Sequence, residues 1–252
     1  MSLDLSPAAA PAPRATRIRN HATLEASLLL RNGEQLLLAL VIPIGILVAG
    51  QLFGGRVGLD PRTFPASVLA LALWSTSFTS LAITTAFERR HGVLERLVAT
   101  PLTRGDLVTA KALAVAAIAA GQVAVLGVVA GALGWRPTPT VAQTLVLVAA
   151  VLLALTTFAA LALAMAGRLR AEATLAAANL VYLLVAAGGG VLLPVAAYPA
   201  AAQPLLHALP FAALGQTLRT WAAGGTDPLP LATLAVWTAA SLFLARKAFR
   251  WM

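Results

Sequence analysis

Long apolar runs separated by short charged stretches dominate the sequence from residue 36 onward. Six of these runs approach or exceed the roughly 20 residues that an α-helix needs to cross a 30 Å hydrocarbon layer. They cover residues 36–53, 64–87, 107–133, 141–166, 173–193 and 229–245. The pattern predicts an all-α polytopic membrane protein with six transmembrane helices.

A less regular pattern precedes the first run. From Ala15 to Arg31, basic side chains alternate with apolar ones such as Ile18, Leu24 and Leu28. A helix of this kind suits an anionic membrane surface, so we expect an amphipathic helix on the cytoplasmic face. A polar leader without an apolar stripe is the alternative. Residues 1–14 are rich in Pro and Ala and are predicted to be a disordered tail, which leaves 15–252 as one transmembrane domain.

The densest run of charge, ERRHGVLERLVATPLTRGD at residues 88–106, lies between the second and third apolar runs. Apolar residues recur within it at helical spacing, at 93, 94, 97 and 98. Gly92 precedes this pattern and Pro101 follows it, so we expect a short amphipathic helix between them. Thr103 and Asp106 then have the spacing of a capping box, which predicts the start of the third transmembrane helix.

Residues 194–228, between the fifth and sixth runs, contain four prolines before residue 211 and apolar pieces too short to cross a membrane. We expect one or two helices over 205–218 that enter the outer half of the bilayer and return, covered by protein. A plain outer loop is the alternative. The three glycines at 188–190 predict unwinding or very close packing where the fifth run ends.

Lysines and arginines fall unequally on the two sides of the predicted topology. Four lie on one side, at 56, 62, 136 and 219, and the other fourteen lie on the side that holds both termini and residues 88–106. Because basic residues concentrate in cytoplasmic loops, we expect both termini and the charged segment to be cytoplasmic. The first 31 residues hold no signal-peptide core, so we expect the amino terminus to be retained.

Composition supports membrane insertion and argues against several functions. The chain is 60% hydrophobic and 11% charged, whereas about a quarter of residues are charged in soluble domains. It has no cysteine, which excludes disulfides and thiolate chemistry. The net charge of +9 flanks apolar runs instead of forming a stripe with aromatics, so we expect no nucleic-acid partner.

Few residues are placed for chemistry. No ionisable residue falls near the middle of a predicted span, and we expect Lys111 to extend to the cytoplasmic interface. A proton- or sodium-coupled transporter normally keeps such a group at mid-depth, so this mechanism is disfavoured. No phosphate-binding loop occurs, and the three histidines lie in separate segments. We therefore predict no catalytic, cofactor or metal site, and we expect Gln122 and Asn179 to form interhelical hydrogen bonds.

The loop pattern E-R-R-x-G-x-L-E-R-L-x-x-T-P-L over residues 88–102, with six spans and a basic amphipathic leader, resembles the ABC-2 type transporter permeases. The nearest likeness is to the drug-efflux branch typified by daunorubicin-resistance permeases. The resemblance implies a bacterial cytoplasmic-membrane subunit that exports a hydrophobic compound. The energy would come from ATP and magnesium on a separate cytoplasmic ATPase, so this chain itself would not be an enzyme and would need no cofactor.

The same resemblance implies a coupling helix that docks on the ATPase, and a second permease chain, identical or sister, as a further partner beside membrane lipid and the substrate. The expected coupling interface consists of Glu88, Arg89, Gly92, Val93, Leu94, Glu95, Arg96, Leu97, Thr100 and Pro101. We expect the two glutamates to pair with basic residues of the ATPase, and the apolar face to supply more of the docking energy. A secondary transporter or channel without an ATPase, and a membrane scaffold or enzyme, are the alternatives.

Overall fold

The computed structural model describes residues 11–31 and 33–248. Within these ranges all regular structure is helical, no strand occurs, and six helical segments are long and apolar enough to cross a membrane. The prediction of an all-α protein with six spans is therefore confirmed. The predicted disordered tail, residues 1–14, lies largely outside the described residues, although Arg14 already begins the first helix.

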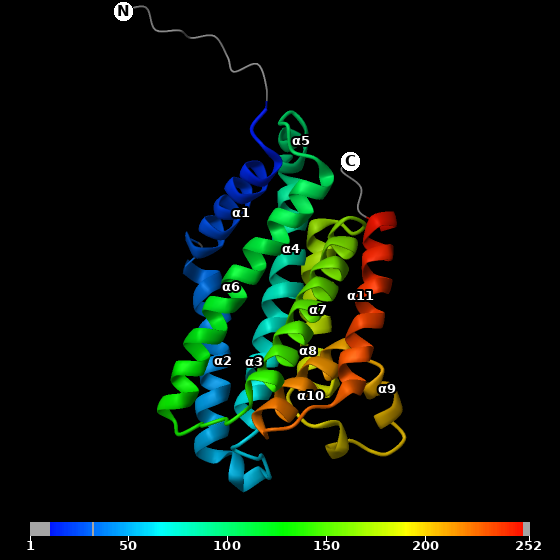
Figure 1. Ribbon diagram of the computed structural model, residues 1–252. Coiled ribbons are helices and arrows are strands. Elements are labelled where there is room, and N and C mark those ends of the chain that lie inside the picture. The colour runs from blue at the N-terminus through cyan, green and yellow to red at the C-terminus, as the bar shows by residue number, and fades with distance from the viewer. Residues whose placement is uncertain (1–10, 32, 249–252) are drawn as a thin grey trace, which may run out of the picture.

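The elements follow one another along the bundle shown in Figure 1. They are α1 (Arg14–Arg31), α2 (Gly33–Phe53), η1 (Gly54–Val57), α3 (Phe64–Trp74), η2 (Ser75–Ser80), α4 (Leu81–Arg90), α5 (Val93–Val98), α6 (Arg104–Ala132), α7 (Val141–Ala166), α8 (Ala171–Gly188), η3 (Val195–Ala197), α9 (Gln203–His207), α10 (Pro210–Ala222) and α11 (Pro228–Ala248).

The second span is the centre of the bundle. It is a continuous helix made of α3, η2 and α4, and the middle part, η2, is a π-helix. Every residue of α3 is buried. The Trp74 ring stacks on Phe78 with centroids 4.3 Å apart and meets Phe158 of α7 and Phe211 of α10 edge-on at 4.8 and 5.4 Å. These contacts fix α7 and α10 against the central helix.

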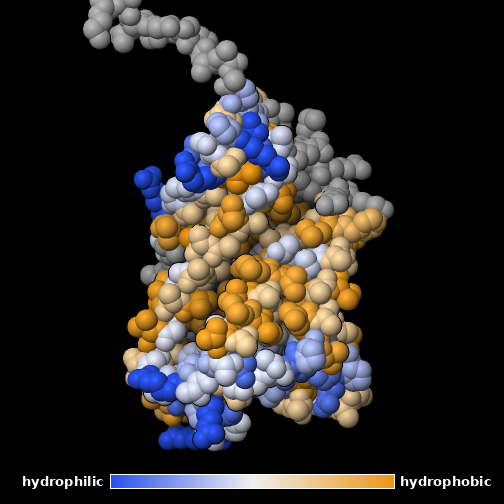
Figure 2. All heavy atoms as spheres, in the orientation of Figure 1, coloured by the Kyte–Doolittle hydropathy of each residue, from blue (hydrophilic) through white to orange (hydrophobic). Residues whose placement is uncertain are grey.

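The molecule has two polar ends and an apolar middle. Figure 1 places α5 and both ends of the described chain at one end, which we call the α5 end, and places η1 and α9 at the other, which we call the opposite end. In Figure 2 hydrophilic residues gather at both ends of the visible face, and a hydrophobic band lies between them. This banding is the surface that a protein spanning a bilayer presents.

Most predicted boundaries agree with the helices within a few residues. The largest difference is at α8, which ends at Gly188 instead of continuing to residue 193. Gly190 takes a left-handed conformation with φ of +72°, and a Cβ on Gly215 of α10 would lie 2.9 Å from the Val191 carbonyl oxygen. The glycines therefore both unwind the chain and allow the close approach of α10, as expected.

The segment after α8 forms the short 3-10 helix η3 and two short α-helices, as expected for non-spanning structure. α9 has five residues and α10 has thirteen, too few to cross a bilayer. α10 is mostly buried, and it packs against α3, α7 and α11. It is thus a structural part of the bundle rather than a plain surface loop.

Candidate functional site

The short helix α5 stands at the tip of the α5 end, where Figure 1 shows it beyond the neighbouring helices. It starts after Gly92, whose φ of +67° is in the region that favours glycine. It ends at Val98, after which the Thr100 hydroxyl donates a hydrogen bond of 2.6 Å to the Leu97 carbonyl. Both boundaries agree with the sequence prediction, which placed the helix between Gly92 and Pro101.

One leucine holds α5 against the bundle. The Leu94 side chain is 1% exposed and packs on Leu107 of α6, which is fully buried, with Leu97 beside them. Burying a leucine contributes about 1.5–3 kcal/mol. Leu94 therefore attaches α5 to the start of α6.

The ten residues predicted for the interface divide into three groups. Leu94 is buried and Glu88 lies within an ion cluster, so these two hold the site together from inside. Three more are partly exposed, namely Arg89, Gly92 and Leu97, and the Arg89 guanidinium donates to the Leu169 carbonyl oxygen at the surface. Five residues are exposed: Val93, Glu95, Arg96, Thr100 and Pro101.

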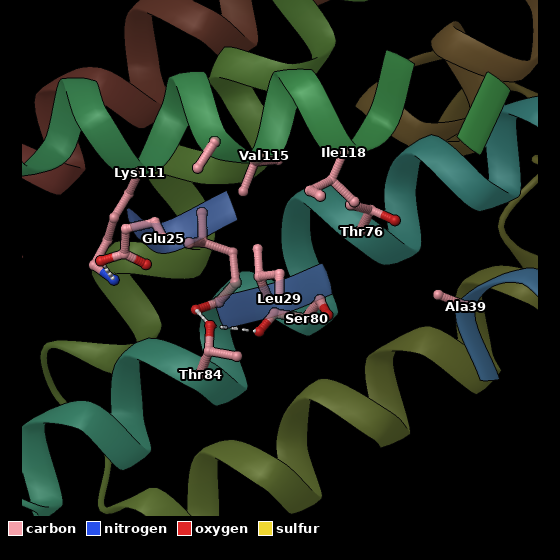
Figure 3. A pocket seen from close by; sticks show the side chains of 11 residues that line it. Glu25, Leu29, Ala39, Thr76, Ser80, Thr84, Lys111, Val115 and Ile118 are labelled. Carbon is pink, nitrogen blue, oxygen red and sulfur yellow. Dashed lines mark hydrogen bonds and ion pairs between the residues drawn. The ribbon is translucent and has the colours of Figure 1, made fainter. Parts of the chain in front are cut away.

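A buried ion cluster joins three helices just below α5. The Lys111 Nζ on α6 lies 2.6 Å from Glu88 Oε2 on α4 and 2.7 Å from Glu25 Oε1 on α1. His21 Nε2, one turn before Glu25, lies 3.1 Å from the same carboxylate oxygen. Figure 3 shows the Lys111 and Glu25 side chains turned toward each other. The cluster connects α1, which we call the leader helix, to α4 and α6, the helices on either side of α5.

The expectation that Lys111 extends to the interface is wrong, because its side chain is fully buried. Two carboxylates supply the hydrogen-bond acceptors that water would otherwise provide, which makes burial of the ammonium group possible. Burial, the largest influence on Glu25, raises the pKa of its carboxyl, but His21 and Lys111 together outweigh it and leave the pKa lowered. The structure therefore favours the charged form of Glu25.

A second ion cluster fixes the start of α6. Thr103 and Asp106 form the predicted capping box, with the Thr103 hydroxyl accepting from the Asp106 amide and the Asp106 carboxylate accepting from the Thr103 amide. The same carboxylate lies 2.7 Å from Arg14 Nε and 3.1 Å from Arg17 Nη2 on α1. One aspartate thus caps α6 and binds the leader helix to it.

A small cavity of about 30 Å³ extends from the ion cluster toward the middle of the bundle (Figure 3). It is lined by Glu25 and Lys111 at one end and by Thr76, Ser80 and Thr84 of the central helix farther in. Such a volume is large enough for a water molecule. The three hydroxyl residues and Glu88 recur every four positions, so the sequence did carry a signal for this polar face.

Gln122 confirms one expected interhelical contact at the inner end of this face. Its Oε1 accepts from the Thr76 hydroxyl at 2.7 Å, and its Nε2 donates to the Ala39 carbonyl oxygen at 2.6 Å. Asn179 differs: it is exposed on α8, and no hydrogen bond of its amide occurs among the described residues. Sequence reasoning also missed Arg219, which was counted with the outer loops but is 5% exposed.

Comparison with protein families gives a match over most of the chain. The family model described as ABC-2 type transporter matches residues 23–221, which run from the middle of α1 to the last turn of α10. The matched range includes α5 and the charged residues Glu25, Glu88, Asp106 and Lys111, but it begins after Arg14, Arg17 and His21. The comparison with curated proteins finds no match.

Proposed function

From the premise that the chain belongs to the ABC-2 type transporter family, we propose that it is the membrane subunit of an exporter of hydrophobic compounds. Membership makes it a non-catalytic, multi-pass permease subunit, and permeases of this family generally pair with an ABC ATPase. The direction of transport, the hydrophobic substrate and a place in the daunorubicin-resistance-like branch are our proposals. So is the source of energy, which would be ATP and magnesium held by the partner.

The observation that supports the proposal most strongly is the way α5 packs against the bundle. This helix exposes Val93, Glu95 and Arg96, yet Leu94 and the Gly92 turn tie it to α4 and α6. A force applied to α5 would therefore reach two transmembrane helices at once. A permease with no nucleotide-binding motif needs such a contact with a separate ATPase if it is to use the energy of ATP.

We infer that the α5 end is cytoplasmic. Both ends of the described chain lie there, as an even number of spans requires (Figure 1). Fourteen of the eighteen lysines and arginines were assigned to this side from the sequence, and basic residues concentrate on the cytoplasmic side of membrane proteins. An ATPase that uses cytoplasmic ATP would then have α5 within reach.

We propose different roles for the ten residues of the expected interface. Val93, Glu95, Arg96, Thr100 and Pro101 contact the ATPase, with Leu97 at the edge of that contact. Exposed ion pairs contribute at most about 1 kcal/mol each, so Val93 supplies more of the affinity than Glu95 or Arg96. Glu88, Arg89, Gly92 and Leu94 position the helix, and substituting them disturbs the fold of the permease as well as the contact.

We also propose that a second permease chain covers the α8 face that bears Asn179. A polar amide facing lipid lacks hydrogen-bond partners, and interhelical hydrogen bonds are a common use of such residues in membranes. Whether that second chain is identical or a sister subunit would follow from the purified complex.

The test is copurification with an ATPase. The tagged chain is solubilised from its native cells, and proteins that bind it are identified and assayed for ATP hydrolysis. Wild type should retain an ABC ATPase. The double variant Val93→Asp, Glu95→Arg, which alters only exposed positions, should lose most of it while keeping a normal thermal unfolding profile.

Arg168→Glu is the matched control, because Arg168 is also exposed on the α5 end but lies outside α5. It should retain the ATPase at the wild-type level. Equal loss in the control would show that α5 is not the specific contact. Transport by the purified chain alone, without any ATPase, would overturn the proposal and favour a secondary transporter or channel.

A further inference from the structure

A hydrophobic groove of about 410 Å³ lies between α6, α7 and α11, in the half of the bundle nearer the α5 end. Figure 1 shows α7 between α6 and α11. Small residues leave the space, among them Gly105 and Ala112 on α6, Ala160 on α7 and Ala245 on α11. Its volume is within the range of sites that hold an extended small molecule.

The walls of the groove are mainly apolar. Only two lining residues carry a polar side chain, and both hydroxyls are used within their own helices. Thr109 donates to the Gly105 carbonyl oxygen and Thr156 to the Leu152 carbonyl oxygen, each at 2.7 Å. The two hydroxyl protons are therefore already donated, and the occupant that fits this mainly apolar groove is a hydrocarbon chain.

A positive charge stands at the mouth of the groove. A Cβ placed on Gly105, which lines the groove at the first turn of α6, would lie 3.8 Å from Arg14 Nη2. The Arg14 side chain is 69% exposed, and its Nε pairs with Asp106, while neither Nη atom forms a described hydrogen bond. Asp106 is already shared with Arg17, so the mouth retains a net positive charge.

We propose that the groove binds one acyl chain of an anionic phospholipid, whose phosphate pairs with the Arg14 guanidinium. An apolar channel below an exposed cation at a membrane interface matches both parts of such a lipid. The assignment to the cytoplasmic leaflet rests on the proposed function, but the binding site itself does not. The bound lipid would join the leader helix to α6, α7 and α11.

Native mass spectrometry of the full chain tests the proposal, with phosphatidylglycerol and phosphatidylcholine as probes in detergent. Wild type should retain one phosphatidylglycerol per chain in preference to phosphatidylcholine. Ala112→Phe, which fills the groove, should lose most of this lipid. Ala117→Phe is the matched control, because Ala117 is exposed on the same helix but does not line the groove, and it should retain the lipid.

The charge is tested separately. Arg14→Gln should weaken phosphatidylglycerol binding about fivefold, the effect of one basic residue near a membrane surface, and leave phosphatidylcholine unchanged. Arg19→Gln is the control, because Arg19 is exposed on the same helix and forms no described ion pair. Equal retention of the two lipids by wild type, or equal retention by Ala112→Phe and Ala117→Phe, would overturn the proposal.

A second experiment uses wild type in lipid nanodiscs, so it does not depend on whether Ala112→Phe folds. The nanodiscs contain phosphatidylglycerol that carries a photoreactive group near the end of its acyl chain. Adducts should concentrate on the wild-type peptides that line the groove. Adducts spread evenly over all exposed helices would refute a specific site. Disulfide formation between two Ala112→Cys chains would assign the groove to a second copy and also refute it. None of these outcomes depends on whether an ATPase binds α5.

Discussion

The two ends of the bundle are held by opposite electrostatic arrangements. At the α5 end, buried charges occur in compensated groups, in which Lys111 meets two glutamates and Asp106 meets two arginines. At the opposite end, Arg219 of α10 is 5% exposed and meets no carboxylate among the described residues. Its nitrogens donate to the carbonyl oxygens of Val191 and Gly190, at 2.8 and 3.0 Å, and to the Ser67 hydroxyl at 3.1 Å.

The two arrangements join different parts of the bundle. Arg219 satisfies carbonyl groups of the non-helical turn that follows α8, so it fixes α10 to this turn and, through Ser67, to α3. The pairs at the α5 end instead join separate helices, α1, α4 and α6, near an aqueous surface.

The largest effect is expected at Lys111. Lys111→Met leaves Glu25 and Glu88 without their shared cation, and breaking a buried pair costs about 3–5 kcal/mol. Thermal unfolding of the purified chain in detergent should show a large drop in midpoint. The triple variant with Glu25→Gln and Glu88→Gln should recover most of the loss, because it removes the uncompensated charges. An unchanged midpoint in Lys111→Met would show that the cluster does not stabilise the bundle.

Arg219→Leu should have the next largest effect, about 3 kcal/mol, because it leaves two carbonyl oxygens without a charged donor. Arg136→Leu is the matched control. Arg136 also donates to backbone carbonyls, those of Gly131 and Trp135, but it is exposed, so water replaces it at little cost. The same unfolding assay compares the two. Equal midpoints for both variants would contradict the role of burial at this end.

Local signals in the sequence were sufficient for the spans and for α5. Hydrophobic run length gave the six helices, and Gly92, Pro101 and the Thr103–Asp106 pair marked the loop between the second and third spans. Each of these features depends on residues within a few positions of one another. The family match and the observed capping box agree with that local reading.

Long-range partners could not be predicted in the same way. Lys111 looked like an interfacial lysine because its two partners lie 23 and 86 positions away, and Arg219 looked like an outer-loop residue because its carbonyl partners lie 28 and 29 positions away. The π-helix η2 is a further example, since a run of Ser and Thr carries no periodicity that distinguishes it from an α-helix. A single sequence therefore predicts neither these long-range contacts nor the π-helix.

A smaller difference in stability is expected between variants of two capping boxes, the one that starts α6 at the α5 end and the one that starts α7 at the opposite end. Asp106 and Gln143 occupy the same position in the two capping boxes, but only Asp106 also binds α1. Asp106→Leu should cost about 2 kcal/mol and Gln143→Leu about 1 kcal/mol in the unfolding free energy. Limited proteolysis should show α1 released in the first variant alone. Equal protection of α1 in both would argue against the Arg14 and Arg17 pairs.

The smallest expected effect is the loss of stability at low pH when Glu25 is protonated. Since the pKa of Glu25 is lowered in the folded chain, its charged form contributes stability that is complete above the ordinary glutamate value of 4.5 and is lost as the pH falls below it. Three ionisable groups lie around this carboxyl: His21 on α1, Lys111 on α6 and Glu88 on α4. Because other carboxylates also titrate there, the measurement is the difference in unfolding midpoint between wild type and Glu25→Gln. That difference should stay constant from neutral pH to about 4.5 and shrink below it. A difference independent of pH would mean that the Glu25 charge does not hold the leader helix to the bundle.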